Sequence, residues 1–127
     1  MALRVWAKGL LCLEAAVELL IGHGRWLCRE DFGQVAVEYG WHAVAGQVSA
    51  SVDLVAAVEA LEAGALPCSS TERQMLQIAA SIAEGVWVDL REGLSGLDEA
   101  NVVLVVGAVL HAAGQRGLGV AGYGVGR

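Results

Sequence analysis

The most chemically varied stretch of the sequence is residues 22–29, which combine a histidine, a thiol, two arginines and an indole ring. Arg25 and Arg29 are four positions apart, so on a helix both guanidinium groups would share one face. Trp26 could stack on a base or another ring, and a nearby helix N-terminus would add positive potential. We therefore predict an anion-binding or partner-binding site at His23, Arg25, Trp26 and Arg29. Two acidic residues follow directly and support a second interpretation, a solvated face of paired charges.

One further pattern invites comparison with an enzyme. His42 followed by Pro67 and Cys68 has the outline of the zinc deaminase pattern HxE…PCxxC. Val44 stands where the proton-shuttling glutamate is required, and Thr71 stands where the second zinc-binding thiolate is required. HExxH, Walker A and GxSxG patterns are absent from the sequence, and the Gly-rich run 117–126 lacks the preceding strand and the lysine that a phosphate-binding loop needs. The sequence therefore predicts no catalytic residue, no cofactor and no metal site, and it favours a non-enzymatic protein.

The three cysteines, Cys12, Cys28 and Cys68, follow neither metal-binding spacing nor a dense disulfide pattern. We expect three buried free thiols. Glu14 and Glu18 interrupt the apolar stretch near the start of the chain, which argues against an export signal. The odd number of cysteines and this interruption predict a cytoplasmic protein.

Charge and hydropathy limit the classes of partner. Eight basic and 14 acidic residues give a net charge of −6, which repels phosphate backbones at long range. Nucleic acid is therefore a disfavoured partner that only a local basic patch would bind. The mean hydropathy is high at +0.56, but the longest charge-free stretch, Ala100 to Gln115, is shorter than the roughly 20 apolar residues of a membrane span. We expect no membrane partner.

Apolar spacing and capping signals predict a series of short helices. Ser69 and Glu72 have the spacing of a capping box, and Asp98 is a suitable N-cap for the last helix. Residues 102–106 would also suit a buried strand, but the N-cap and the longer apolar run favour a helix there. The expected helices cover residues 10–21, 26–39, 52–63, 69–84, a short stretch from 89, and 98–114, with either a short helix or a loop at 42–48.

These elements predict an all-α fold, a compact bundle of five or six short helices. We expect residues 1–116 to form a single helical domain. Residues 117–127 contain five glycines and are predicted to be a flexible tail.

Several strings between residues 52 and 114 carry a resemblance to a known group of proteins. They are LPCS from Leu66, IAASIAEG from Ile78, VDLR from Val88 and GLDEAN from Gly96. With these strings, the chain resembles small Ala-rich helical proteins of actinobacteria, a group with no assigned activity. The resemblance implies a cytoplasmic helical domain and no activity, substrate or catalytic residue.

Two functions remain open on this basis. The first is a non-enzymatic protein–protein interaction module, with self-association as one mode, because the helix at 101–110 is apolar all round and needs an enclosed core or a partner. The four tryptophans, Trp6, Trp26, Trp41 and Trp87, are candidate interface anchors. The alternative is a small helix-turn-helix-like transcriptional regulator that contacts DNA through the Arg25 and Arg29 face.

Overall fold

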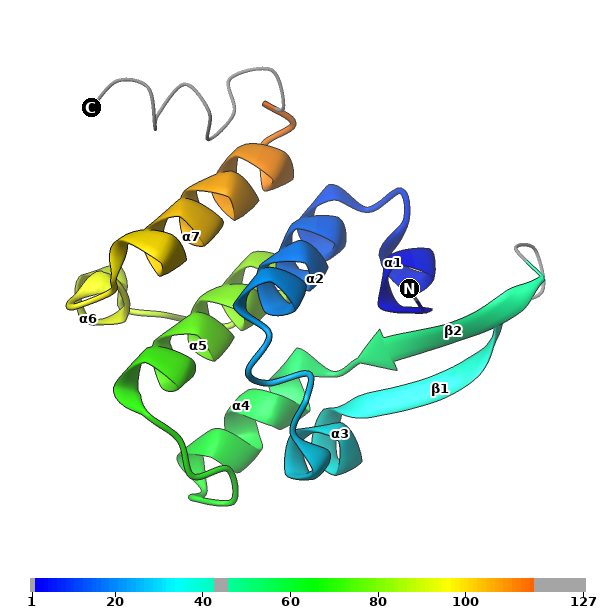
Figure 1. The fold of residues 1–127 in the computed structure, drawn as a ribbon, viewed down its shortest axis with the longest axis horizontal. Helices are drawn as coiled ribbons and strands as arrows, with labels where there is room; N and C mark the ends of the chain where they lie inside the picture. The colour runs from blue at the N-terminus through cyan, green and yellow to red at the C-terminus, as the bar shows by residue number, and fades with distance from the viewer. Residues whose placement is uncertain (1, 43–45, 116–127) are drawn as a thin grey trace.

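The chain folds mainly into helices, and a computed structural model describes residues 2–42 and 46–115 (Figure 1). The described part contains seven helices and one antiparallel pair of strands. The prediction of a mostly helical protein is confirmed, whereas the prediction of an all-α bundle is wrong. In chain order the elements are α1 (Ala2–Ala7), α2 (Leu11–His23), α3 (Glu30–Ala36), β1 (Val37–His42), β2 (Gln47–Val52), α4 (Leu54–Glu62), α5 (Ser70–Glu84), α6 (Leu90–Leu94) and α7 (Glu99–Ala112).

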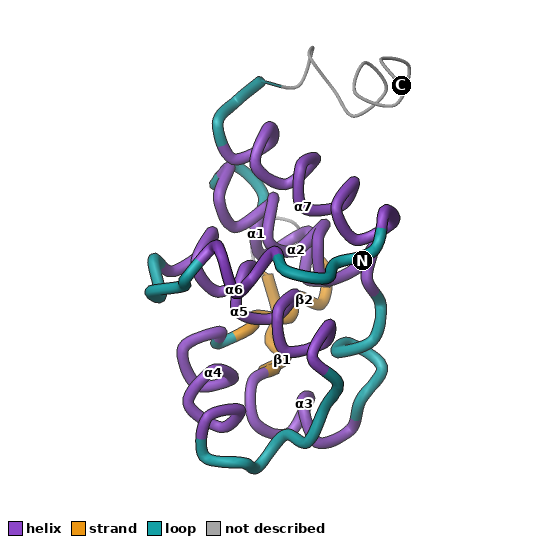
Figure 2. Tube along the Cα trace, turned by 90° about the vertical axis from the view of Figure 1, so that its left-hand side faces the viewer, coloured by secondary structure: helices purple, strands orange, loops and turns teal. Residues whose placement is uncertain are grey.

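Helix α2 is the centre of the helical body, with α5 and α7 packed against it and α4 packed on α5 (Figures 1 and 2). Leu19 and Leu20 of α2 and Met75 and Leu76 of α5 are almost fully buried. Gly22 allows α7 to come close to α2, because a Cβ atom at this position would lie only 2.6 Å from Cδ2 of Leu104. The apolar stripes of these helices thus meet in one core.

The helix boundaries follow the capping signals of the sequence. The Ser69 hydroxyl accepts a hydrogen bond from the Glu72 backbone N–H, and the Glu72 carboxylate accepts one from the Ser69 N–H, so the predicted capping box is present. Asp98 caps α7 as predicted, and residues 102–106 are helical. Gly24 ends α2 with φ 75°, a left-handed conformation that side chains with a Cβ rarely adopt.

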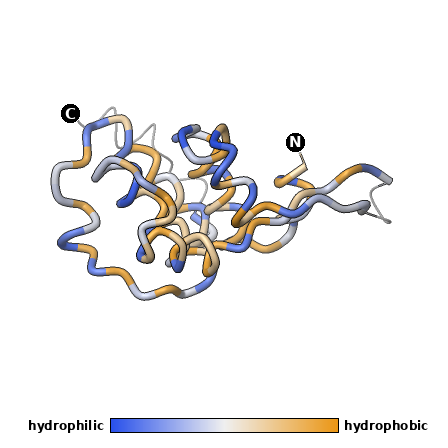
Figure 3. The backbone as a smooth tube through the Cα atoms, turned by 90° about the horizontal axis from the view of Figure 1, so that it is seen from below, coloured by the Kyte–Doolittle hydropathy of each residue, from blue (hydrophilic) through white to orange (hydrophobic). Residues whose placement is uncertain are grey.

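Strands β1 and β2 replace the last three residues of a predicted helix and most of the ambiguous segment after it. The helix expected over residues 26–39 begins only at Glu30 and ends at Ala36. Of the segment 42–48, for which a short helix or a loop was expected, His42 lies in β1, Gln47 and Val48 lie in β2, and residues 43–45 lie outside the described residues. The strands pair from Val37 opposite Val52 to His42 opposite Gln47. Their apolar residues alternate with polar ones, a period-two pattern typical of a strand with one covered face. Figure 3 shows hydrophobic (orange) stretches interrupted by neutral and hydrophilic (white to blue) ones along the hairpin.

Helix α1, which packs on β2 and α2, is not among the helices expected from the sequence. Leu3 and Ala7 of this short helix are buried in the common core. No helix among the described residues is long and apolar enough to cross a membrane. The predicted flexible tail at 117–127 lies outside the described residues.

Candidate functional site

The predicted cluster around residue 25 spans a turn between two helices instead of lying on one helix. Helix α2 ends at His23, and Arg29 is the N-cap of α3. Arg25 lies in the intervening turn and is exposed. The expectation that Arg25 and Arg29 share a helical face is therefore wrong, because α3 begins only at Glu30, after both arginines.

Trp26 is a core residue, with none of its surface exposed. Its indole N–H donates a hydrogen bond of 2.8 Å to the backbone carbonyl of Glu72, which ties the turn to α5. The ring lies 5.5 Å from the Phe32 ring between centroids, and the Arg29 guanidinium carbon lies 4.6 Å from its centre. Trp26 is thus inaccessible to a partner and serves as a packing anchor.

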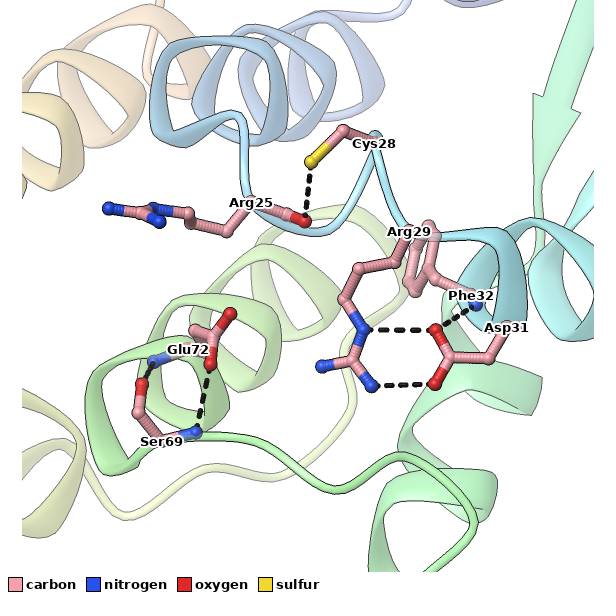
Figure 4. A network of polar contacts seen from close by, with 7 residues as sticks. All are labelled: Arg25, Cys28, Arg29, Asp31, Phe32, Ser69 and Glu72. Carbon is pink, nitrogen blue, oxygen red and sulfur yellow. Dashed lines mark hydrogen bonds and ion pairs between the residues drawn. The ribbon is translucent and has the colours of Figure 1, made fainter.

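Arg29 is paired within its own segment (Figure 4). Its Nε and Nη2 atoms donate to the two carboxylate oxygens of Asp31 at 2.9 and 2.6 Å. These hydrogen bonds lower the pKa of Asp31, with a smaller contribution from the Phe32 backbone N–H. A phosphate would have to displace this bidentate partner. The DNA-binding alternative thus loses the shared arginine face on which it was based.

His23 and Arg25 meet elsewhere, in a cleft of about 590 Å³. Nδ1 of His23 is buried and has no hydrogen-bond partner among the described residues. Burial lowers the pKa of His23, partly offset by the charge of Glu72. The other residues that line this cleft, at the starts of α5 and α7, were not predicted as site residues. The sequence identified some of them only as helix-capping positions. These lining residues are Ser69, Thr71, Glu72, Asp98, Ala100, Asn101 and Leu104.

A second candidate site is the outer part of the hairpin. Tyr39, Trp41 and Val48 project from one face of the strands and expose 77%, 67% and 54% of their surfaces. We call these three residues the hairpin face. On the same face, Ala50 and Val52 are buried against the body, so the apolar surface continues from the core into solvent. Exposed apolar surface of this kind is typical of an interaction site.

The outer edge of β1 offers backbone groups next to the same rings. The Asp53 backbone N–H donates to the carbonyl of Ala36 at 2.7 Å, so residues 36 and 53 are a hydrogen-bonded pair. In an antiparallel pair of strands, every second residue along β1 then forms hydrogen bonds with β2. Residues 38 and 40 therefore point their N–H and C=O groups toward β2, and Tyr39 and Trp41 point theirs outward. Apart from β2, the main neighbour of β1 among the described elements is α3, which directly precedes it.

The remaining candidates are distributed over the surface. Trp87 is 83% exposed, and Trp6 is half-buried. Cys12 and Cys28 are exposed and Cys68 is half-buried, so the expectation of three buried thiols is wrong. Within residues 2–42 and 46–115, no three His, Cys, Asp or Glu side chains are arranged to hold a metal ion.

Comparison of the chain with protein-family models, curated proteins and solved structures found no match in any of the three. The resemblance to Ala-rich actinobacterial proteins stays a prediction, as does partner binding by His23, Arg25 and Arg29, whereas the fourth predicted residue, Trp26, is buried.

Proposed function

We propose that the protein is a non-enzymatic interaction module that self-associates through the hairpin face and the outer edge of β1. The observation that carries the proposal is the apolar face of the hairpin, which is covered at its base and uncovered at Tyr39, Trp41 and Val48. A two-stranded ribbon is marginally stable alone, and added strands or a covering surface stabilise it. An open strand edge beside exposed aromatic rings is a template for pairing with another chain.

The charge distribution favours a second copy of this chain as the partner. Strand β2 has no charged residue, and Glu38, the only one in β1, lies on the face opposite Tyr39 and Trp41. Two copies therefore meet without burying a charge, although each carries a net charge of −6. A strongly acidic or basic partner would find no complementary charge on the hairpin face.

Pairing of β1 with β1 of a second copy gives a specific arrangement. An antiparallel pair about a two-fold axis at Gly40 places Tyr39 opposite Trp41 of the partner subunit. The outward backbone groups of both residues then form hydrogen bonds, and the rings become cross-strand neighbours in a four-stranded sheet. Aromatic side chains bury roughly 150–250 Å² each, so two rings supply less than the about 800 Å² per partner of a standard interface. We expect a weak, concentration-dependent dimer.

Sedimentation velocity over a concentration series tests the proposal, with Trp41→Ser as the variant. The wild-type protein should shift from monomer to dimer as concentration rises, and the variant should stay monomeric over the same range. Trp87→Ser is the matched control, since it removes a comparably exposed indole from the α5–α6 connection and should leave dimerisation unchanged. A wild-type protein that stays monomeric, or a Trp41→Ser variant that dimerises equally well, would contradict the proposal.

A second pair of variants separates edge pairing from packing of the face. Tyr39→Ser and Tyr39→Pro both remove the ring, but only the proline also removes the outward N–H, which β2 does not use. If the edges pair, dimerisation should be weaker in Tyr39→Pro than in Tyr39→Ser. Equal weakening would assign the contact to the rings alone and would rule out the four-stranded sheet.

A further inference from the structure

The connection between α5 and α6 carries an exposed indole that lines a second cleft. This cleft, which we call the Trp87 cleft, has a volume of about 480 Å³, within the range of small-molecule sites. Its other lining residues come from α4, α5 and α6, and Trp87 itself exposes 83% of its surface. Figure 1 shows α6 at the opposite end of the molecule from the outer part of the hairpin. The Trp87 cleft is therefore separate from the proposed self-association surface.

The backbone on both sides of Trp87 is anchored to the helical body. Val86 is half-buried and packs against the core. Val88 is also half-buried, and its Cγ2 atom lies 3.5 Å from the place that a Cβ atom would take at Gly93 of α6. Trp87 lies outside the core of the described residues. An exposed indole is thus held on a fixed backbone between two packed neighbours.

Gln74 of α5 fixes α6 beside this indole. Its Nε2 atom donates hydrogen bonds to the backbone carbonyls of Glu92 and Ser95, at 2.9 and 2.6 Å. Oδ1 of Asp89 accepts from the backbone N–H groups of Arg91 and Glu92 and caps α6. The walls of the cleft are therefore formed before a ligand arrives, which lowers the entropic cost of binding.

The polar side chains of the cleft include both donors and acceptors. Arg73 is exposed and Gln77 is half-buried, and neither side chain forms a hydrogen bond or an ion pair with the described residues. Glu62 and Glu92 line the same cleft. An anionic ligand would meet the two carboxylates, and a cationic ligand would meet the guanidinium group of Arg73. Hydroxyl groups both donate and accept, so a neutral ligand rich in hydroxyls is compatible with all four side chains.

We propose that the Trp87 cleft binds a neutral saccharide. The apolar C–H face of a pyranose ring stacks on the exposed indole, because the negative π-face attracts the weakly positive C–H groups. The ring hydroxyls form hydrogen bonds with Arg73, Gln77 and Glu92 at the edge of the stacked ring. A pyranose whose hydroxyls are all equatorial suits the site best, since its C–H faces are then unobstructed. The indole is largely exposed to solvent, so we expect millimolar affinity.

The test uses the full chain labelled with ¹⁵N and cellobiose as the probe, titrated to about 50 mM, which detects millimolar affinity. Saturable shifts are expected for the indole N–H signal of Trp87 and for backbone signals of residues 73–77 and 87–92. Trp87→Ser should weaken binding at least about tenfold, and because the ring is 83% exposed the fold should persist. Trp87→Phe keeps an aromatic face and should retain part of the affinity. Trp41→Ser removes a comparably exposed indole from the hairpin and should leave binding unchanged.

Two further probes separate saccharide stacking from other contacts. Glycerol carries hydroxyl groups but no pyranose face, and spermidine carries ammonium groups on an aliphatic chain. Neither should give saturable shifts of the Trp87 indole signal over the same concentration range. An absence of saturable shifts with cellobiose, equal binding by Trp87→Ser, or saturable shifts with spermidine alone would overturn the proposal. Trp41→Ser should abolish dimerisation and Trp87→Ser should abolish saccharide binding, so failure here is distinguishable from failure of self-association.

Discussion

The helical body and the β1–β2 hairpin use the same residue types in opposite ways. Trp26 in the body is fully buried, forms a hydrogen bond with the Glu72 carbonyl and contacts the Phe32 ring. Trp41 in the hairpin exposes 67% of its surface and lies on a face that is covered only at its base. The N–H group and the ring of Trp26 therefore both have partners within the chain. The difference indicates that the body is stabilised within one chain, whereas the hairpin face is suited to a partner.

The largest effect on the free energy of unfolding is expected at the buried indole of Trp26. Trp26→Ala should reduce the free energy of unfolding by about 3–5 kcal/mol, because it opens a cavity and leaves the Glu72 carbonyl without its donor. Chemical denaturation monitored by far-UV circular dichroism measures this loss. Trp87→Ala, at an 83% exposed position, should change stability by less than about 0.5 kcal/mol. Equal effects of the two substitutions would contradict the distinction between core and exposed indoles.

The elements that the sequence predicts well are those with a signal at each end. Residues 69–84 begin with a capping box and end before Gly85, whose φ of 70° suits a helix C-terminus. The last helix begins at the Asp98 cap, which decided correctly against a strand at 102–106. In both cases local hydrogen bonding and long-range packing favour the same structure, so local reasoning is sufficient.

The hairpin and the turn before α3 show why the rest was not predicted. Phe32, Val35 and Tyr39 have helical spacing, yet Val37, Tyr39 and Trp41 equally have strand spacing, and pairing with residues 47–52 decides between them. The arginines were placed on one helix because a helix was expected from residue 26, whereas α3 begins only at Glu30. His23 and Arg25 do line one cleft, but Asn101 joins them only through the packing of α7 on α2.

An effect of intermediate magnitude on stability is expected at the start of α5, where the Glu72 carboxylate caps the helix. The Ser69 backbone N–H is the largest cause of a lowered pKa at Glu72, so the folded state favours the ionised carboxylate. Glu72→Gln keeps the hydrogen bond but removes the charge, and it should cost about 0.5–1 kcal/mol at pH 7.

The pH dependence of this effect has a definite sign. A lowered folded pKa contributes stability above the unfolded pKa, and that contribution is lost as pH falls through the folded value. The stability difference between wild type and Glu72→Gln should therefore shrink below about pH 4.3. Urea denaturation at several pH values measures it, and a constant difference would show that the charge of Glu72 has no part in stabilising the helix.

The smallest effect on stability is expected in the hairpin. Trp41→Ala should change the free energy of unfolding of the monomer by less than about 0.5 kcal/mol, because most of this ring contacts solvent and no core cavity forms. Denaturation at a protein concentration below the onset of dimerisation measures the free energy of unfolding of the monomer alone. At higher concentration wild type should gain stability by mass action, and the variant should not. A large loss in the dilute monomer would mean that the ring packs on its own chain, and the two regions would then differ in exposure but not in role.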